Sequence, residues 1–375
     1  MNCPENMIEW TKTHERSDKM EADRYRKLIQ QELAALPDYV MAYYRGTNLA
    51  MTTTYQYLTE FRRFFNWLRA NQISHATDNQ RIATTELAHL RREDIMLYID
   101  DLKHTKNAQG RANSATSINR SLNALRSLFK FLTITADNND GEPYFERNVM
   151  LKIPSLNSTQ TLNYRAHALA SHMYRGELKF DFLTFIAQEY PQKCDKRAQA
   201  SFMINQERDL AIIALILGTG IRVSEAANVN LADLNWQQKM LDVTRKGGQK
   251  DSIPIAPWVM PYLTQYQQIR ATRYHALKKD VAFFLTNYHG ETRRISANSI
   301  ERLVKKYSTA FGRPLTPHKL RHTLASELYE VTKDQVLVAQ QLGQKGTSAT
   351  DLYTHVDQSV QKAALAKISK PEEEG

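Results

Sequence analysis

Two positions near the middle of the chain carry residue types that could bind a phosphate group. Arg222 follows the glycine-containing run GTGI, and Glu225 lies three residues further on. Residues at this spacing share a helix face, and a guanidinium can bind two phosphate oxygens while a carboxylate holds it in place. Taken alone, the same pair is also typical of a surface ion pair.

The segment LTPHKLRH offers a second phosphate-binding group. Thr316 is a good N-cap and Pro317 suits the first helical position, so His318 falls in the first turn with Arg321 on the same face. A helix amino terminus favours a bound phosphate, and histidine with arginine would complete an oxyanion clamp. Two alternatives stay open. His318 could simply cap or pack, or His318 and His322 could bind a metal, which the intervening positive charges disfavour.

A lysine and a tyrosine complete the set. Lys246 lies in TRKGG, which predicts a β-turn, and a mobile turn could bring its ammonium to a leaving oxygen as a general acid. An exposed turn lysine is the simpler interpretation. Tyr353 lies in SATDLYTHV and is one of 18 tyrosines. Tyrosine can form covalent intermediates, but its free pKa of about 10 requires cationic neighbours that favour the phenolate.

The amino-terminal part of the chain reads as helices. Apolar residues recur at three- and four-residue spacing in residues 55–68 and again in residues 118–132, which predicts two buried helix stripes. Arginines such as Arg62, Arg63 and Arg126 fall on other faces. Such arginines are consistent with a solvated surface, and several basic helices in one domain favour a surface that faces DNA.

The carboxy-terminal part reads as mostly helical with a small antiparallel sheet. The stretch ERDLAIIALILGTG predicts a buried helix stopped by Gly218 and Gly220. MLDVT and DSIPI, separated by RKGGQK, predict a β-hairpin. AFFLT is a short strand or helix, and we expect helices from there to Leu365.

A linker candidate, IPSLNSTQTLNY, has a proline, small polar residues and no period. It places a domain boundary near residues 154–165. We therefore expect one domain over residues 1–160, preceded by an extension over 1–19, and a second over 166–375.

Composition narrows the class of protein. The chain has 375 residues and a formal net charge of +10, which favours a polyanionic partner. No run of about 18 apolar residues and no apolar signal core occurs, so we expect neither a membrane span nor secretion. The two cysteines, Cys3 and Cys194, belong to no CxxC motif. We expect a reduced, cytoplasmic protein without structural zinc.

No single element decides the function, but their order and spacing do. GTGIRVSEAANVNLADL, the turn lysine, HKLRH, LGQ and TDLYTH together resemble the tyrosine recombinase and integrase family over about residues 207–356. The resemblance implies a mainly α, two-domain, C-shaped DNA clamp. The helical amino-terminal half would be its core-binding domain and residues 166–375 its catalytic domain.

The resemblance also implies a reaction that needs no cofactor and no metal. Arg222 and Arg321 would bind the scissile phosphate of double-stranded DNA. Tyr353 would attack it and form a 3′-phosphotyrosyl link, and Lys246 would protonate the leaving 5′ oxygen.

Three further residues take supporting roles by the same resemblance. Glu225 matches an acidic support residue, and His318 matches the residue that assists proton transfer at the tyrosine. Gln344 departs from the pattern, because the family usually has LGH where this chain has LGQ. An amide can donate a hydrogen bond to the phosphate but cannot titrate, so we expect weakened activity.

More narrowly, PYFERNVM, NQERDLAIIALI, VTRKGGQKDSIPI and TKDQVLVAQQLG resemble the XerS branch of the family. This branch implies chromosome-dimer resolution at a dif-like site during cell division, by a homotetramer on two sites, with an FtsK-type DNA translocase as a candidate partner. The last helix, around QKAALAKI, would be exchanged between subunits. The alternatives are a phage or mobile-element integrase, or a catalytically weakened DNA-binding partner.

Overall fold

The computed structural model describes residues 23–106, 110–157, 160–245, 247–288, 290–344, 346–347, 350–356 and 365. Several sequence-based expectations lie outside these residues. They are the extension over residues 1–19, the turn lysine Lys246, and the exchanged carboxy-terminal helix except for Leu365.

The chain divides into two compact units, Met1–Thr159 and Gln160–Gly375. The linker expected near residues 154–165 spans this division. Its end is helical, however, because the Thr161 side chain accepts a hydrogen bond from the Tyr164 N–H at 3.2 Å and caps a helix that starts at Leu162.

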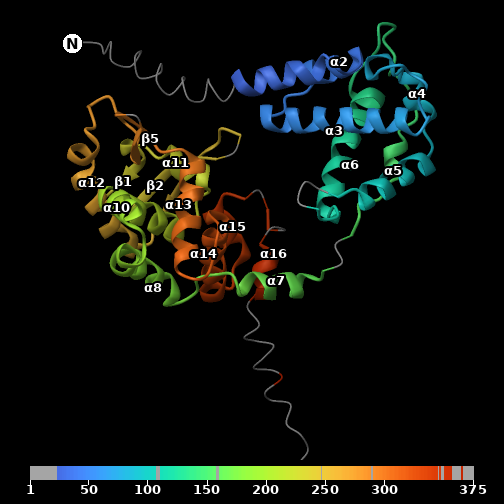
Figure 1. The fold of residues 1–375 in the computed structure, drawn as a ribbon. Helices are drawn as coiled ribbons and strands as arrows, with labels where there is room; N and C mark the ends of the chain where they lie inside the picture. Colours follow the sequence, from blue (N-terminus) through green and yellow to red (C-terminus); the bar gives the residue numbers. More distant parts are fainter. Residues whose placement is uncertain are drawn as a thin grey trace, which may run out of the picture. The chain divides into compact units, whose positions relative to one another are not determined.

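The regular elements of unit 1 are helices in its described residues, joined by loops that contain two isolated β-bridges (Figure 1). Its elements are residues 23–33, α2 (Asp38–Gly46), α3 (Met51–Ala70), η1 (Asn79–Arg81), α4 (Thr84–His89), α5 (Arg92–His104), α6 (Ala115–Lys130), the π-helical η2 (Phe131–Thr135) and η3 (Val149–Lys152). The two predicted stripes are confirmed: Leu58, Phe61 and Phe64 of α3 and Leu122 and Leu125 of α6 are fully buried.

Unit 2 is mainly helical with two small antiparallel sheets (Figure 1). Its elements are α7 (Leu162–Ala170), α8 (Leu178–Thr184), η4 (Phe185–Glu189), α9 (Tyr190–Lys193), α10 (Lys196–Thr219), α11 (Val223–Asn228), η5 (Leu231–Asp233), β1 (Leu234–Asn235), β2 (Met240–Thr244), β3 (Lys250–Pro254), η6 (Pro257–Val259), α12 (Met260–Tyr274), β4 (Leu285–Tyr288), β5 (Glu291–Arg294), α13 (Ala297–Ala310), α14 (Pro317–Thr332), α15 (Gln335–Leu342) and α16 (Asp351–Val356). The expected fold class, mainly α with a small antiparallel sheet in the second domain, is confirmed.

The hairpin expected from MLDVT and DSIPI is present as β2 and β3. The two strands pair antiparallel, with Thr244 opposite Lys250 at the turn, and β1 extends the sheet on the other side of β2. A second hairpin, β4 and β5, was not predicted. The expectation of continuous helix after AFFLT was wrong because Gly290, at φ +80°, supports a tight turn between these strands.

The buried helix α10 is longer than expected at its carboxyl end. It runs through Gly218 and ends only at Gly220, which takes a left-handed φ of +69°. Gly218 was wrongly predicted to stop the helix. A Cβ at Gly218 would lie 2.2 Å from a methyl group of Val259, so glycine serves here to let η6 pack closely against the helix.

Helices α14, α15 and α16 lie together in unit 2, with α7 against α16 (Figure 1). Small apolar clusters hold this group together: Leu169 and Val356 pack α7 on α16, and Val338, Leu342 and Tyr353 pack α15 on α16. In the described parts of the chain, no helix has the length and apolar character needed to cross a membrane.

Candidate active site

The turn between α10 and α11 places the first predicted arginine. Arg222 is the N-cap residue of α11, and its backbone N–H and its guanidinium both donate to the Glu225 carboxylate at 2.8 Å. Glu225 is only 5% exposed, whereas the Arg222 side chain is 34% exposed. The pair predicted from the spacing is therefore present, with the carboxylate buried and part of the Arg222 side chain exposed.

A second arginine, not predicted from the sequence, shares the same carboxylate. The buried guanidinium of Arg245, at the end of β2, donates to Glu225 at 3.0 Å and to Asp251 of β3 at 2.9 Å. It also donates to the backbone carbonyl of Gln341 at 3.1 Å. The sequence signal was an arginine directly before the turn lysine, but nothing local indicates that it is buried.

Arg321 lies on α14 and is 3% exposed. Its guanidinium donates to the carbonyls of Gly220 at 2.6 Å and Leu342 at 2.7 Å, so it joins the α10–α11 turn to the end of α15. Burial and the nearby charge of Arg222 lower the pKa of Arg321 to about 10, while Glu225 raises it. Arg321 is therefore charged at neutral pH, and its charge interacts repulsively with that of Arg222.

The amino terminus of α14 was predicted in its position but not in its capping. Thr316 is the N-cap residue and Pro317 occupies the first turn, as expected. The Thr316 side chain makes no capping hydrogen bond, however, so the expected cap interaction was wrong. His318 follows on the first turn and is exposed.

Tyr353 is 2% exposed, and its hydroxyl lies 2.7 Å from Nδ1 of His322. Burial raises the pKa of Tyr353 to about 12, and the charge of Arg321 opposes this rise. Burial, with the adjacent His318, lowers the pKa of His322 to about 3. His322 is therefore neutral at pH 7, and its Nδ1 shares a hydrogen bond with the protonated phenol.

The two histidines of HKLRH contact each other rather than flank an open ligand site. The rings of His318 and His322 are edge to face at 4.3 Å between centroids, and Nδ1 of His322 faces the tyrosine. Partial burial of the ring, together with the charges of Arg321, Lys319 and Arg222, lowers the pKa of His318. Within the described ranges, no cluster of three or more metal-ligating side chains occurs.

Gln344 follows the end of α15. Gly343 takes a left-handed φ of +59° there, and the Gln344 N–H donates to the carbonyl of Ala339 at 2.9 Å. Its side-chain oxygen is buried without a hydrogen-bond partner among the described residues. A buried acceptor of this kind is normally satisfied by a hydrogen-bond donor.

The turn that carries Lys246 is described only around that residue. Gly247 and Gly248 both have left-handed φ angles, of +95° and +83°, and the Arg245 N–H donates to the Gln249 carbonyl at 2.7 Å. Lys246 itself lies outside the described residues.

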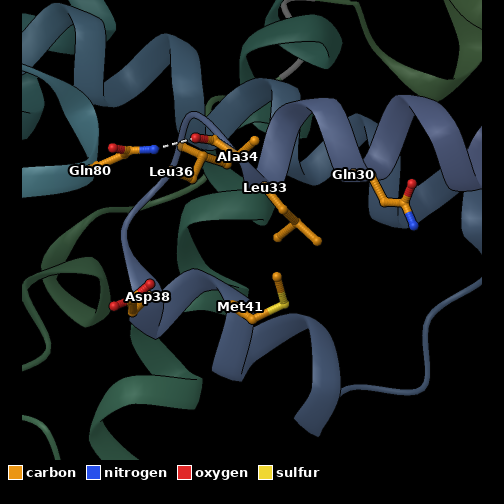
Figure 2. A pocket seen from close by; sticks show the side chains of 7 residues that line it. All are labelled: Gln30, Leu33, Ala34, Leu36, Asp38, Met41 and Gln80. Atoms are coloured by element: carbon orange, nitrogen blue, oxygen red, sulfur yellow. Dashed lines mark hydrogen bonds between the residues drawn. The ribbon is translucent and has the colours of Figure 1, made fainter.

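A hollow in unit 1 offers a different kind of surface (Figure 2). Its lining contains both apolar and polar side chains, and the Gln80 side chain donates to the Ala34 carbonyl at one edge. Asp38 is the one ionisable residue among its lining side chains, which are Gln30, Leu33, Ala34, Leu36, Asp38, Met41 and Gln80. It contains no group that could act as an acid and base pair.

Comparisons with known proteins decide the family. Residues 193–359 match the phage integrase family. The tyrosine recombinase XerS of Streptococcus gordonii (strain Challis) is 46% identical over 347 residues, which cover 91% of this chain and 98% of the relative. The chain belongs to the tyrosine recombinase family. XerS of Streptococcus mutans serotype c is 47% identical over 355 residues, 92% of this chain and 99% of that relative.

Solved structures agree on the fold. The XerH site-specific recombinase bound to a palindromic difH substrate, in a post-cleavage complex, matches with a TM-score of 0.58 and 19% identity over 84% of this chain and 79% of that chain. The Tn1549 transposon integrase in complex with transposon right-end DNA matches with a TM-score of 0.56 and 17% identity, over 88% and 98%. The chain is thus a tyrosine recombinase by sequence and by fold, an enzyme of site-specific DNA recombination.

Sequence reasoning missed two residues of this site, Arg245 and His322. His322 was considered only as a metal ligand. Its spacing of four from His318 was the available signal, but the partner that matters, Tyr353, lies 31 residues away and meets it only through packing of α16 on α14.

Proposed function

We propose that Tyr353 is the nucleophile of a DNA strand exchange that proceeds by two transesterifications. Its oxygen attacks a DNA phosphorus, a P–O bond to tyrosine forms, and the P–O5′ bond breaks. The leaving 5′ oxygen takes a proton from Lys246. A 5′-hydroxyl of the partner strand then reverses the step, so the phosphodiester count is unchanged and no nucleotide energy source is needed.

The phosphate would bind at the partly exposed side chain of Arg222, close to the buried Arg321. Arg222 and Arg321 supply positive charge where the phosphorane oxygens gain charge, and Glu225 holds Arg222 in place. Gln344 would donate its amide to a phosphate oxygen.

Tyr353 needs an acceptor for its proton. His322 is within hydrogen-bond distance of the hydroxyl, and His318 is the next imidazole in line. We propose that this pair takes the proton as the oxygen attacks, with His318 acting through His322. The tyrosine oxygen thus exchanges its bond to hydrogen for the new bond to phosphorus.

We propose that the biological reaction is resolution of chromosome dimers at a dif-like site. Support comes from the near full-length similarity to relatives named XerS and the fold shared with a recombinase bound to difH. A homotetramer on two sites, an FtsK-type translocase partner and a cytoplasmic location belong to the same proposal. The net charge of +10 suits a DNA partner.

The observation that carries the proposed chemistry is the convergence of Tyr353, His322, Arg321 and Arg222 from three helices in one small region. A suicide substrate, a dif-like duplex nicked next to the scissile phosphate, tests it. The nicked fragment diffuses away after attack, so the wild-type protein accumulates on DNA as a covalent adduct.

Tyr353→Phe should form no adduct and still bind the duplex. Tyr329→Phe is the matched control, because Tyr329 packs against the same apolar cluster and carries no proposed role. An adduct formed by Tyr353→Phe would exclude Tyr353 as nucleophile. Wild-type adduct on integrase sites but not on dif-like sites would favour the mobile-element alternative.

A further inference from the structure

Arg245 has a place in this site that the reaction above does not use. It is 6% exposed, and its guanidinium contacts two carboxylates and one backbone carbonyl. Each partner belongs to a different element: Glu225 to α11, Asp251 to β3 and Gln341 to α15. One side chain therefore joins three segments, each of which neighbours a residue with a proposed role.

The contact with Glu225 links Arg245 to the phosphate-binding arginine. One oxygen of Glu225 accepts both from Arg245 at 3.0 Å and from the Arg222 N–H at 2.8 Å, and the other accepts from the Arg222 guanidinium. The carboxylate is thus shared between the two arginines.

The contact with α15 links Arg245 to the segment that presents Gln344. A Cβ at Gly343 would lie 2.3 Å from Nε of Arg245, so the guanidinium rests directly against the backbone there. The side chain of Gln341 donates to the carbonyls of Thr219 and Pro254, which fixes the same helix end to α10 and β3. This close approach needs a glycine and a planar cation.

The position of Arg245 in the chain completes the argument, because Lys246 is the next residue. The backbone N–H of Arg245 closes the turn by donating to Gln249, and its side chain anchors the start of that turn. A buried ion pair is weak evidence for stability, since an apolar side chain can fill such a place at lower electrostatic cost. Its directional contacts are better explained by orientation.

We propose that Arg245 is a positioning residue that holds the Lys246 turn in register with Arg222 and Gln344. This inference rests on the proposed function, in which Lys246 protonates the leaving oxygen. A general acid works only within hydrogen-bond reach of its target, and a misplacement of about 1 Å costs roughly 10²-fold in rate. Loosening Arg245 should therefore impair leaving-group protonation before it impairs DNA binding.

A substrate with sulfur in place of the bridging 5′ oxygen separates these effects. A thiolate leaves without a proton, because its conjugate acid is far more acidic than an alcohol. The nicked dif-like duplex is prepared in oxygen and sulfur forms, and single-turnover adduct formation is measured for each variant. We expect Arg245→Lys to slow cleavage of the oxygen form by about 10–100-fold and to cleave the sulfur form within a few-fold of wild type.

Three further variants serve as controls for this measurement. Lys246→Ala should show the same restoration by sulfur, which checks the general acid itself. Arg222→Ala should be slow on both substrates, because phosphate binding is lost. Arg208→Lys is the matched control: Arg208 is also buried, pairs with Asp209 at 2.7 Å and donates to the Leu285 carbonyl, yet touches none of these segments. It should leave the ratio of the two rates unchanged.

The outcomes separate the two claims. If sulfur restores Lys246→Ala but Arg245→Lys stays equally slow on both forms, the positioning role is wrong and the general acid stands. If sulfur fails to restore cleavage by Lys246→Ala, the proposed role of Lys246 is wrong, and the positioning role of Arg245 is wrong as well. Should Arg245→Lys not fold, Asp251→Asn removes one carboxylate that holds the same guanidinium and must show the same restoration.

Discussion

Replacing His322 by glutamine tests whether a neutral imidazole faces the proposed nucleophile. Nδ1 of His322 lies 2.7 Å from the Tyr353 hydroxyl, and Lys319 and Arg321 add positive charge on the same helix. Glutamine keeps an acceptor for the phenol but cannot bind a proton in this pH range. The substitution therefore removes the titration and keeps the contact.

The magnitude follows from the pKa of His322. Its value is about 3 in the folded protein, against about 6.5 in an unfolded chain. Between these values the unfolded state binds more protons, so stability falls as the pH is lowered from about 6.5 toward 3. Linkage then gives a loss of about 2 kcal/mol between pH 7.5 and pH 5 for this one group.

The assay is urea denaturation of the full chain at several pH values between 7.5 and 5. Wild type and His322→Gln should share the contributions of all other groups, so their difference isolates His322. We expect the variant to lose about 2 kcal/mol less than wild type over this range. His172→Gln, an exposed histidine of the same unit, serves as the control and should follow wild type. Parallel profiles for wild type and His322→Gln would refute the buried, neutral imidazole.

Three further predictions concern the phosphate-binding region. Glu225→Gln removes the charge shared by Arg222 and Arg245, so it should lower the unfolding free energy by about 3 kcal/mol, measured by denaturation, and slow cleavage. DNA affinity at low salt, measured by filter binding, should be unchanged. Gly220→Ala should cost about 1–3 kcal/mol of unfolding free energy, because φ is +69° and a Cβ would lie 2.8 Å from a leucine methyl; an unchanged melting temperature would contradict this. Gln344→His should raise single-turnover cleavage by up to about 10²-fold by restoring the imidazole donor, and an unchanged rate would mean that the amide serves as well.

The sequence predicted those features that depend on local pattern. The stripes of α3 and α6 and the β2–β3 hairpin followed from apolar period and turn residues alone. The pairing of Arg222 with Glu225 followed from a three-residue spacing. The expected helix in place of β5 failed because a four-residue strand of polar residues carries no distinct period.

What the sequence by itself determined is the family and the kinds of group that do the chemistry, because the order of arginine, lysine, His-x-x-Arg and tyrosine is a linear property. Only the tertiary structure decided which groups touch. Burial of α16 against α7 and α14 brings the Tyr353 hydroxyl to His322 rather than His318. Packing of α15 on the β2–β3 hairpin buries Arg245, so that its guanidinium contacts both elements. Such contacts join residues far apart in the chain, and their strength comes from exclusion of water, which no local spacing encodes.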